Sequence, residues 1–143
     1  MIRRLLPEDA PRLAQIETLQ PYSAHWGEKG FADELPNPYS FVWCWEEKGE
    51  VNGFIALRLA GGFCEILNMA VHPDECRRGI GFKLLYFALS QVRAHGGERI
   101  TLEVNAHNAA AIGLYTKMGF RPCGRRKQFY NGTDDALIMG ADL

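Results

Sequence analysis

The sequence predicts an α+β fold with a mixed, mostly antiparallel central sheet of about seven strands and flanking helices. Three observations predict it. Three consecutive runs rich in Val, Ile, Phe and Trp lie between residues 40 and 71, a strand–helix–strand succession spans residues 63–105, and a hairpin surrounds Asn131-Gly132 near the end of the chain. The strand–helix–strand unit requires a right-handed crossover and therefore one pair of parallel strands.

Glycine and proline separate the individual elements, and apolar residues at helical spacing mark the helices. The expected strands are residues 2–5, 40–47, 51–60, 63–71, 99–105 and the two arms of a hairpin from Arg125 to Met139. The expected helices are residues 8–19, residues 28–35, a helix from Ile80 to Gly96-Gly97, and residues 109–118. The last helix has Asn108 as its N-cap and Gly119 as its C-terminal signal.

The composition excludes several classes of protein. The 143 residues are 47% hydrophobic, which is enough for one folded domain over 1–143 and excludes intrinsic disorder. The 16 Lys and Arg residues balance 17 Asp and Glu residues, so no positive surplus favours nucleic acid. No apolar run is long enough for a membrane span or a secretory signal. We expect a cytoplasmic protein with no direct nucleic-acid partner and no membrane partner.

The cysteines and histidines predict no metal site. The four cysteines form no C-x-x-C pair, and the four histidines are equally scattered. We interpret the cysteines as reduced thiols.

A glycine-containing loop after the strand 63–71 is the first candidate for chemistry. Arg77-Arg78-Gly79-Ile80-Gly81-Phe82 lies where a strand has ended and a helix begins. The first N–H groups of a helix have no internal partners and carry the positive end of its dipole, so such a loop suits a pyrophosphate. A tight turn that needs glycine for its dihedral angles is the alternative.

Two further residues suggest acid and base chemistry. The strand 99–105 alternates apolar residues with Thr101, Glu103 and Asn105, and its place after a crossover helix predicts an interior strand. A cleft on that polar face would make Glu103 a candidate base, whereas a solvent-exposed face is the alternative. Tyr115 places a hydroxyl on an apolar helix, as either a candidate acid or a core tyrosine.

Taken together, these motifs resemble the GNAT superfamily of acetyl-CoA-dependent N-acetyltransferases over nearly the whole chain. The segments that carry the resemblance are Leu67 to Pro73, Arg77 to Phe82, and Asn108 to Phe120. Further segments resemble the bacterial ribosomal-protein-alanine N-acetyltransferases, namely Trp26 to Phe31, Leu102-Glu103-Val104, Arg125 to Tyr130, and Asp134 to Met139.

The resemblance implies a cofactor site between two splayed strands, one carrying Met69 and the other Glu103. The residues it implies for acetyl-CoA are Met69, Ala70 and Val71 by their main chain, Arg77, Arg78, Gly79, Ile80, Gly81 and Phe82 at the pyrophosphate, and Asn108 at its helix start. Asn108 is equally explained as an N-cap, or as both. One departure is Cys76, which stands where the superfamily usually has Gln or Arg.

The resemblance also implies the reaction. Glu103 is the implied base, directly or through a water, and Tyr115 the implied acid, with an acceptor that is the N-terminal α-amine of a protein, such as the alanine of a ribosomal protein. Trp26, Phe31 and Tyr130 lie in segments that line the acceptor groove in that family, with ordinary core packing as the alternative. Acetylation of a lysine side chain or small amine, or a non-catalytic acetyl-CoA-binding module, remain the competing functions.

Overall fold

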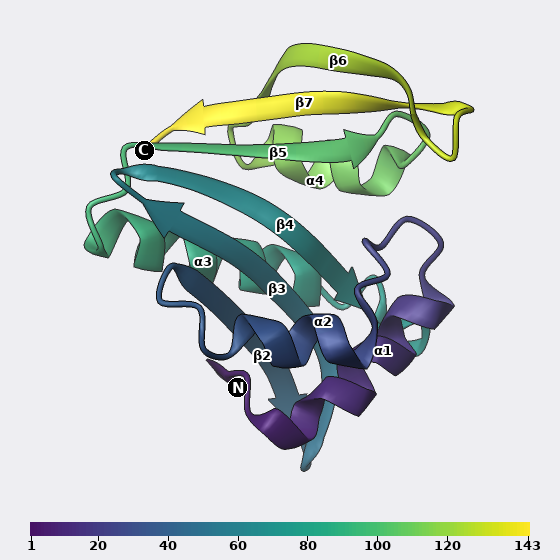
Figure 1. Cartoon of the computed structure of the whole chain (residues 1–143), viewed down its shortest axis with the longest axis vertical. Coiled ribbons are helices and arrows are strands. Elements are labelled where there is room, and N and C mark those ends of the chain that lie inside the picture. The colour runs from purple at the N-terminus through teal and green to yellow at the C-terminus, as the bar shows by residue number, and fades with distance from the viewer.

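The computed structural model describes residues 1–143 and contains one seven-stranded sheet in the order β1-β2-β3-β4-β5-β7-β6 (Figure 1). The strands are β1 (Ile2–Arg4), β2 (Ser40–Glu47), β3 (Glu50–Ala60), β4 (Phe63–Val71), β5 (Arg99–Asn105), β6 (Arg121–Tyr130) and β7 (Asp134–Asp142). The helices are α1 (Ala10–Leu19), α2 (Gly27–Glu34), α3 (Ile80–Ala94) and α4 (Ala109–Lys117), with short 3-10 turns at Pro7–Asp9 and Pro73–Glu75. Only β4 and β5 pair in parallel, so the predicted fold class is confirmed.

The largest difference from the predicted boundaries is in the final hairpin. Strand β6 begins at Arg121, four residues before the expected Arg125. The sequence did not predict this start, because Pro122-Cys123-Gly124 has no strand pattern. Proline is tolerated here because β6 is the edge strand of the sheet, where a missing N–H leaves no ladder bond unmade. The register of β6 against β7 shifts between Pro122 and Gly124.

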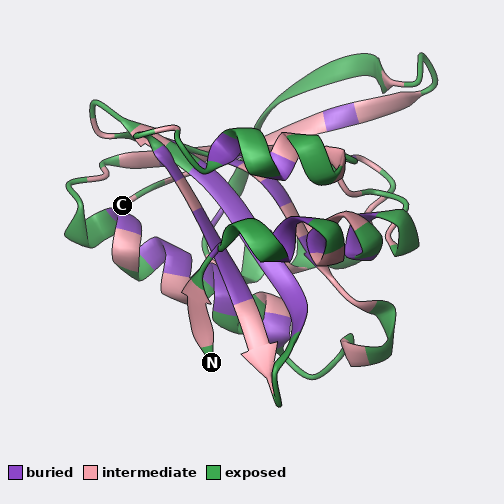
Figure 2. Ribbon diagram, turned by 60° about the horizontal axis from the view of Figure 1, so that its bottom comes forward, coloured by how far each residue is buried: buried purple, intermediate pink, exposed green.

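The helices cover the two faces of the sheet. Helices α3 and α4 lie on one face and α1 and α2 on the other (Figures 1 and 2). Leu84 of α3 and Ile100 of β5 belong to the core on the first face, whereas Leu13 of α1 and Phe54 of β3 belong to the core on the second. None of the helices combines the length and the apolar content that a membrane span would need.

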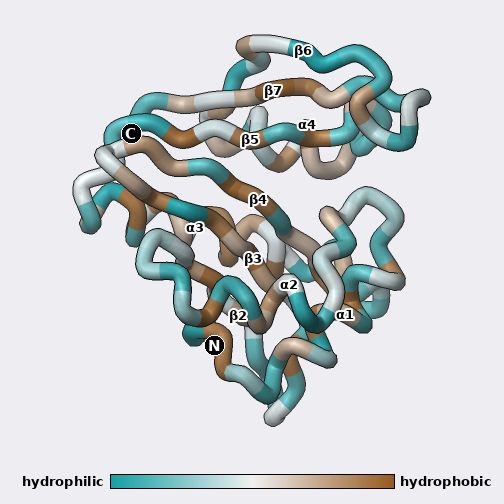
Figure 3. Tube along the Cα trace, viewed as in Figure 1, coloured by the Kyte–Doolittle hydropathy of each residue, from teal (hydrophilic) through white to brown (hydrophobic).

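The hydropathy of each strand follows its place in the sheet. Central strand β3 is buried continuously from Val51 to Leu57 because helices cover both of its faces. Edge strand β6 is exposed over almost its whole length, and Figure 3 shows it as mainly hydrophilic.

Strands β4 and β5 separate part-way along their length. Their ladder runs from Phe63↔Arg99 to Ile66↔Leu102 and then stops, although both strands continue (Figure 1). On the other side of β4, the pairing with β3 skips Leu67, which is a β-bulge. The extra residue reverses the side-chain alternation, so Ile66 faces the α3 side and Asn68 the α1 side.

Candidate active site

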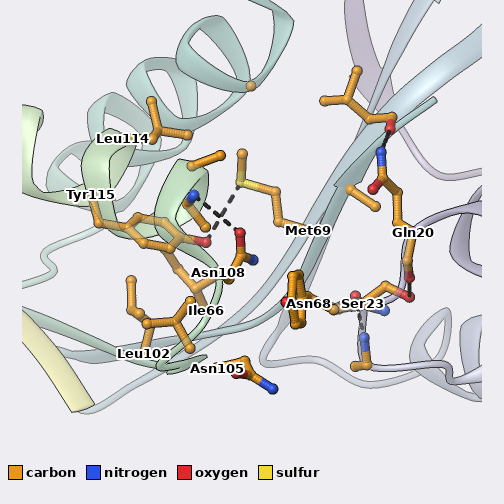
Figure 4. Close-up of a pocket in the computed structure, with 18 of the residues that line it drawn as sticks. Gln20, Ser23, Ile66, Asn68, Met69, Leu102, Asn105, Asn108, Leu114 and Tyr115 are labelled. Atoms are coloured by element: carbon orange, nitrogen blue, oxygen red, sulfur yellow. Dashed lines mark hydrogen bonds between the residues drawn. The ribbon is translucent and has the colours of Figure 1, made fainter. Parts of the chain in front are cut away.

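A cavity of about 970 Å³ opens where β4 and β5 diverge (Figure 4). Its walls come from the α1–α2 loop, β4, the loop before α3, β5, α4 and β6. Most of the residues that the sequence predicted for a site line this cavity. They are Met69, Ala70, Val71, Arg77, Gly79, Ile80, Gly81, Phe82, Glu103, Asn108, Tyr115 and Tyr130.

The loop before α3 presents unpaired N–H groups to the cavity. Arg77 and Gly79 both adopt left-handed backbone conformations, with φ of +70° and +79°. The first amide of the helix to bond within it is that of Lys83, which donates to the carbonyl of Gly79 at 3.0 Å. The N–H groups of residues 80–82 therefore have no partner inside the helix and remain available to an anion.

Arg78 differs from its expected place. Its guanidinium contacts Glu47 of β2 through two hydrogen bonds of 3.0 Å each, and it also pairs with Glu75. Arg78 is the one residue of the predicted pyrophosphate loop that does not line the cavity. The hydrogen bonds from Arg78 and, to a smaller extent, from Trp45 lower the pKa of Glu47 to about 2. The sequence predicted Arg78 at the pyrophosphate, and in the structure two carboxylates hold its side-chain charge outside the cavity.

Tyr115 of α4 reaches into the gap beside β4. Its side chain is almost completely buried, and its hydroxyl donates only to the sulfur of Met69 at 3.9 Å (Figure 4). Burial, with a smaller effect of Tyr130, raises the pKa of Tyr115 to about 12. Tyr115 is thus a neutral phenol at pH 7 whose one partner is a weak acceptor, so its proton is free to move to another acceptor. A Cβ at Gly81 would lie 3.2 Å from the Met69 Cε atom, so a larger residue there would require a small shift of the Met69 side chain.

Glu103 lies on the opposite face of the sheet from Tyr115. Its neighbours Leu102 and Val104 belong to the α3-side core together with Tyr115, so alternation along β5 turns Glu103 toward the α1 side. The Glu103 Oε1 atom lies 2.8 Å from Nε of Arg126, and its side chain is 27% exposed. The cavity therefore runs through the sheet from one face to the other.

Arg126 is a site residue that the sequence reasoning missed. It lines the cavity from β6, and its guanidinium lies 5.4 Å from the ring centre of Phe129. Burial, followed by the charge of Glu103, raises the pKa of Tyr130 in the same wall. Arg126 is 23 residues from Glu103, so only the strand order β5-β7-β6 brings the two together.

The α1–α2 loop is attached to β4 by a buried polar network. Glu17 is 1% exposed and accepts hydrogen bonds from the amides of Trp26 and Gly27 and from Nδ2 of Asn68, at 2.8, 3.0 and 2.8 Å. Asn68 in turn accepts from the amide of Ala24 at 3.2 Å. One feature of the sequence indicates this network. Glu17 lies four residues after Leu13, so a charged residue stands on the apolar face of its helix.

A second contact joins the α1–α2 loop to the end of β4. The side-chain amide of Gln20 donates to the carbonyl of Val71 at 2.6 Å (Figure 4). The thiol of Cys76 lies 3.6 Å from the Gln20 amide and 3.6 Å from the carbonyl of His72. The carbonyl of Val71 is therefore already satisfied.

Two of the three aromatic residues predicted to bind the acceptor lie outside the cavity. Phe31 is completely buried between Trp26 and Phe54, with ring-centre distances of 5.3 and 5.1 Å. Neither Trp26 nor Phe31 lines the cavity, which corresponds to the core-packing alternative. The exposed tyrosine of the α1–α2 loop, Tyr22, lines the cavity together with Tyr130.

The position of Asn108 is compatible with both expected roles, the helix cap and the contact with the cofactor. Its Oδ1 atom accepts a hydrogen bond from the Ala111 amide at 3.3 Å, which caps α4, and the residue also lines the cavity. The structure brings together no cluster of three or more His, Cys, Asp or Glu residues that would hold a metal ion.

Comparison with known proteins decides the family. The family described as "Acetyltransferase (GNAT) family" matches residues 5–120. The chain belongs to the GNAT acetyltransferase family. This GNAT chain is 32% identical over 145 residues to the "[Ribosomal protein bS18]-alanine N-acetyltransferase" of Escherichia coli, covering 99% of this chain and 97% of that protein.

Two further comparisons agree with the GNAT assignment. An "N-alpha-acetyltransferase" of Sulfurisphaera tokodaii is 29% identical over 154 residues, covering 99% of this chain and 83% of that protein. The crystal structure of the Escherichia coli ribosomal-protein-S18-alanine N-acetyltransferase superposes with a TM-score of 0.89 at 30% identity, covering 99% of this chain and 92% of that one.

The GNAT cavity fits acetyl-CoA, which GNAT enzymes use as the acetyl donor. The separated edges of β4 and β5 leave main-chain groups for an extended pantetheine arm, and residues 80–82 offer free amides to a pyrophosphate. Bound there, the donor supplies an activated acetyl thioester.

Proposed function

We propose that this GNAT enzyme acetylates the N-terminal alanine of ribosomal protein bS18, with Glu103 as the base and Tyr115 as the acid. The observation that carries the proposal is the cavity that runs through the sheet. The anion-binding loop and Tyr115 lie on its α3 side, and Glu103 lies on its α1 side. Donor and acceptor would then approach the reacting carbon from opposite faces. The similarity of nearly the whole chain to bS18-alanine N-acetyltransferases supports the choice of acceptor.

The first step removes a proton from the acceptor. A protein α-amine has a pKa of about 7.7 to 8.0, so at neutral pH most of it is an ammonium ion without a nucleophilic lone pair. Glu103 takes this proton, directly or through one water. The Arg126 guanidinium pairs with this carboxylate at 2.8 Å, so the acceptor amine must displace it to reach Glu103.

The second step forms the amide. The amine lone pair makes the new C–N bond at the thioester carbon, and the carbonyl electron pair moves onto oxygen. An amide N–H in the segment Met69 to Val71, which lines the cavity, would stabilise this oxyanion. When the oxyanion collapses, the C–S bond breaks and the thiolate takes the proton of Tyr115. The amide nitrogen loses its extra proton, which restores the Tyr115 phenol. In total, an ammonium and a thioester give an amide, a thiol and one proton.

Two peptides with acetyl-CoA test the choice of amine. One begins with a free alanine and lacks lysine, and the other is N-terminally blocked and contains lysine. We expect mass spectrometry to show a gain of one acetyl group on the first peptide alone. Gain on the second alone would overturn the α-amine assignment, and gain on neither would favour a small amine or a non-catalytic module. Full-length bS18 with a free N-terminal alanine then tests the specific acceptor, with N-terminally acetylated bS18 as the matched control.

A further inference from the structure

The cluster around Arg78 suggests a function for a residue that does not reach the cavity. We propose that Arg78, held by Glu47 and Glu75, is a positioning residue that fixes the pyrophosphate loop in its binding conformation without contacting the phosphates. The proposal rests on the use of acetyl-CoA by GNAT enzymes and is independent of the acceptor.

The geometry of the contact is that of a fixed bridge. Two parallel hydrogen bonds of 3.0 Å join Nη1 and Nη2 of Arg78 to the two carboxylate oxygens of Glu47, and Glu75 pairs with the same guanidinium. Bidentate pairing of this kind fixes orientation as well as distance. The bridge therefore joins the loop both to strand β2 and to the 3-10 turn that precedes the loop.

The partner of Arg78 on β2 is itself held in place. Glu47 also accepts a hydrogen bond of 2.7 Å from Nε1 of Trp45. The ammonium group of Lys83, in the first turn of α3, lies 5.2 Å from the centre of the Trp45 ring. The end of β2 thus contacts the loop at Arg78 and the helix just after it, so it is a rigid support for the segment that would bind the anion.

The loop backbone needs such a support. Arg77 is a non-glycine residue with φ of +70°, a left-handed conformation that is unfavourable for residues with a Cβ. This backbone places Arg77 in the cavity wall and Arg78 outside it. Strained backbone persists only where its surroundings impose it. In this proposal, the bridge at the next residue, Arg78, provides that restraint.

Charge argues against direct phosphate binding by Arg78. One guanidinium faces two carboxylates, so the cluster of Glu47, Glu75 and Arg78 carries a net charge of −1 and would repel a pyrophosphate. Arg77 and the amides of residues 80–82 provide the positive potential instead. Loss of conformational entropy in the loop weakens binding of the donor. A loop that is already ordered loses less of it, so the donor binds more tightly.

The variants Glu47→Gln, Arg78→Gln, Arg78→Lys and the double variant Glu47→Gln/Arg78→Gln test the proposal. The dissociation constant of CoA is measured by titration calorimetry, and hydrogen exchange of residues 76–83 is measured in the free protein. We expect each variant to weaken CoA binding roughly 3- to 10-fold and to speed exchange in this segment, with the double variant no worse than the single ones. Arg99→Gln is the matched control, because it removes an exposed ion pair with Asp142 away from the cavity.

A direct phosphate contact gives the opposite pattern. Removing Glu47 would then free Arg78, so Glu47→Gln would bind CoA as well as or better than the parent, and Arg78→Lys would keep most of the affinity. Either result would overturn the proposal. As a second check, KM for S-acetylpantetheine, which lacks the pyrophosphate, should be unchanged in all four variants. A loss of the same size with this short donor would also refute a function confined to the pyrophosphate loop.

Discussion

Replacing Tyr115 by Phe tests catalysis separately from stability. The substitution removes one hydroxyl and keeps the ring, whose centre lies 5.6 Å from that of Phe120. The hydroxyl itself donates only to the Met69 sulfur, at 3.9 Å. Because this contact is long and sulfur is a weak acceptor, its loss should change the free energy of unfolding by less than about 1 kcal/mol.

The effect on the rate should be much larger. A positioned general acid contributes roughly 10²- to 10⁴-fold to the rate, so kcat should fall by that factor, which corresponds to about 3 to 5.5 kcal/mol in the activation barrier. The dissociation constant of acetyl-CoA should stay nearly the same, because the proton is needed only when the C–S bond breaks.

The pH profile gives an independent measure of the same group. Burial raises the pKa of Tyr115 from 10.0 to about 12. The folded enzyme therefore keeps this proton up to pH 10, and we expect no decline of kcat from Tyr115 below that pH. The same shift stabilises the folded state fully below pH 10, and that stabilisation is lost as the pH rises toward 12.

Mass spectrometry of the acetylated peptide gives kcat, calorimetry gives the affinity for acetyl-CoA, and urea unfolding gives stability. Tyr39→Phe is the matched control, since Tyr39 is exposed and lies outside the cavity. A Tyr115→Phe enzyme with kcat within about threefold of the parent would refute the assignment of Tyr115 as the acid.

Three other predictions follow from the site and the core. Glu103→Gln should lower kcat roughly 10²- to 10⁴-fold with unchanged affinity for acetyl-CoA, and full activity would remove Glu103 from the mechanism. Burial raises the pKa of the two interior thiols to about 12, so iodoacetamide at pH 8 should modify only Cys76 and Cys123 in the folded protein. Acetyl-CoA should protect Cys76, which lines the cavity, but not Cys123, and equal labelling with and without the donor would contradict this placement. Phe31→Ala should cost about 3–5 kcal/mol in urea unfolding, because the side chain is completely buried, and a loss below about 1 kcal/mol would argue against its core position.

Local patterns predicted those parts of the molecule whose structure depends on neighbouring residues. The Phe-, Ile- and Leu-containing run of β3 and the helical spacing from Ile80 to Val92 both correspond to observed elements. Asn108 is recognisable as a cap from the sequence, because an N-cap requires only its own helix. The first residues of β6 escaped prediction because Pro122 and Gly124 show strand structure only through the pairing with β7.

Contacts between distant segments were beyond the reach of such patterns. The motif placed Arg78 in the pyrophosphate loop, but its partner Glu47 lies 31 residues away on β2 and decides which way its side chain turns. Phe31 occupies an aromatic segment that the resemblance assigned to the acceptor groove. The packing of α2 against Phe54 places it in the core instead.

Sequence patterns predict the fold class and the position of the glycine-containing loop, and the resemblance to the GNAT family adds the candidate acid and base. The fold class depends on periodicity, and the loop depends on backbone conformations that favour glycine. That the cavity runs through the sheet and that Glu103 faces Arg126 is visible only in the folded chain. A single-residue shift in register moves a side chain to the other face of its strand. The bulge at Leu67 makes that shift in β4, and only the completed sheet shows it.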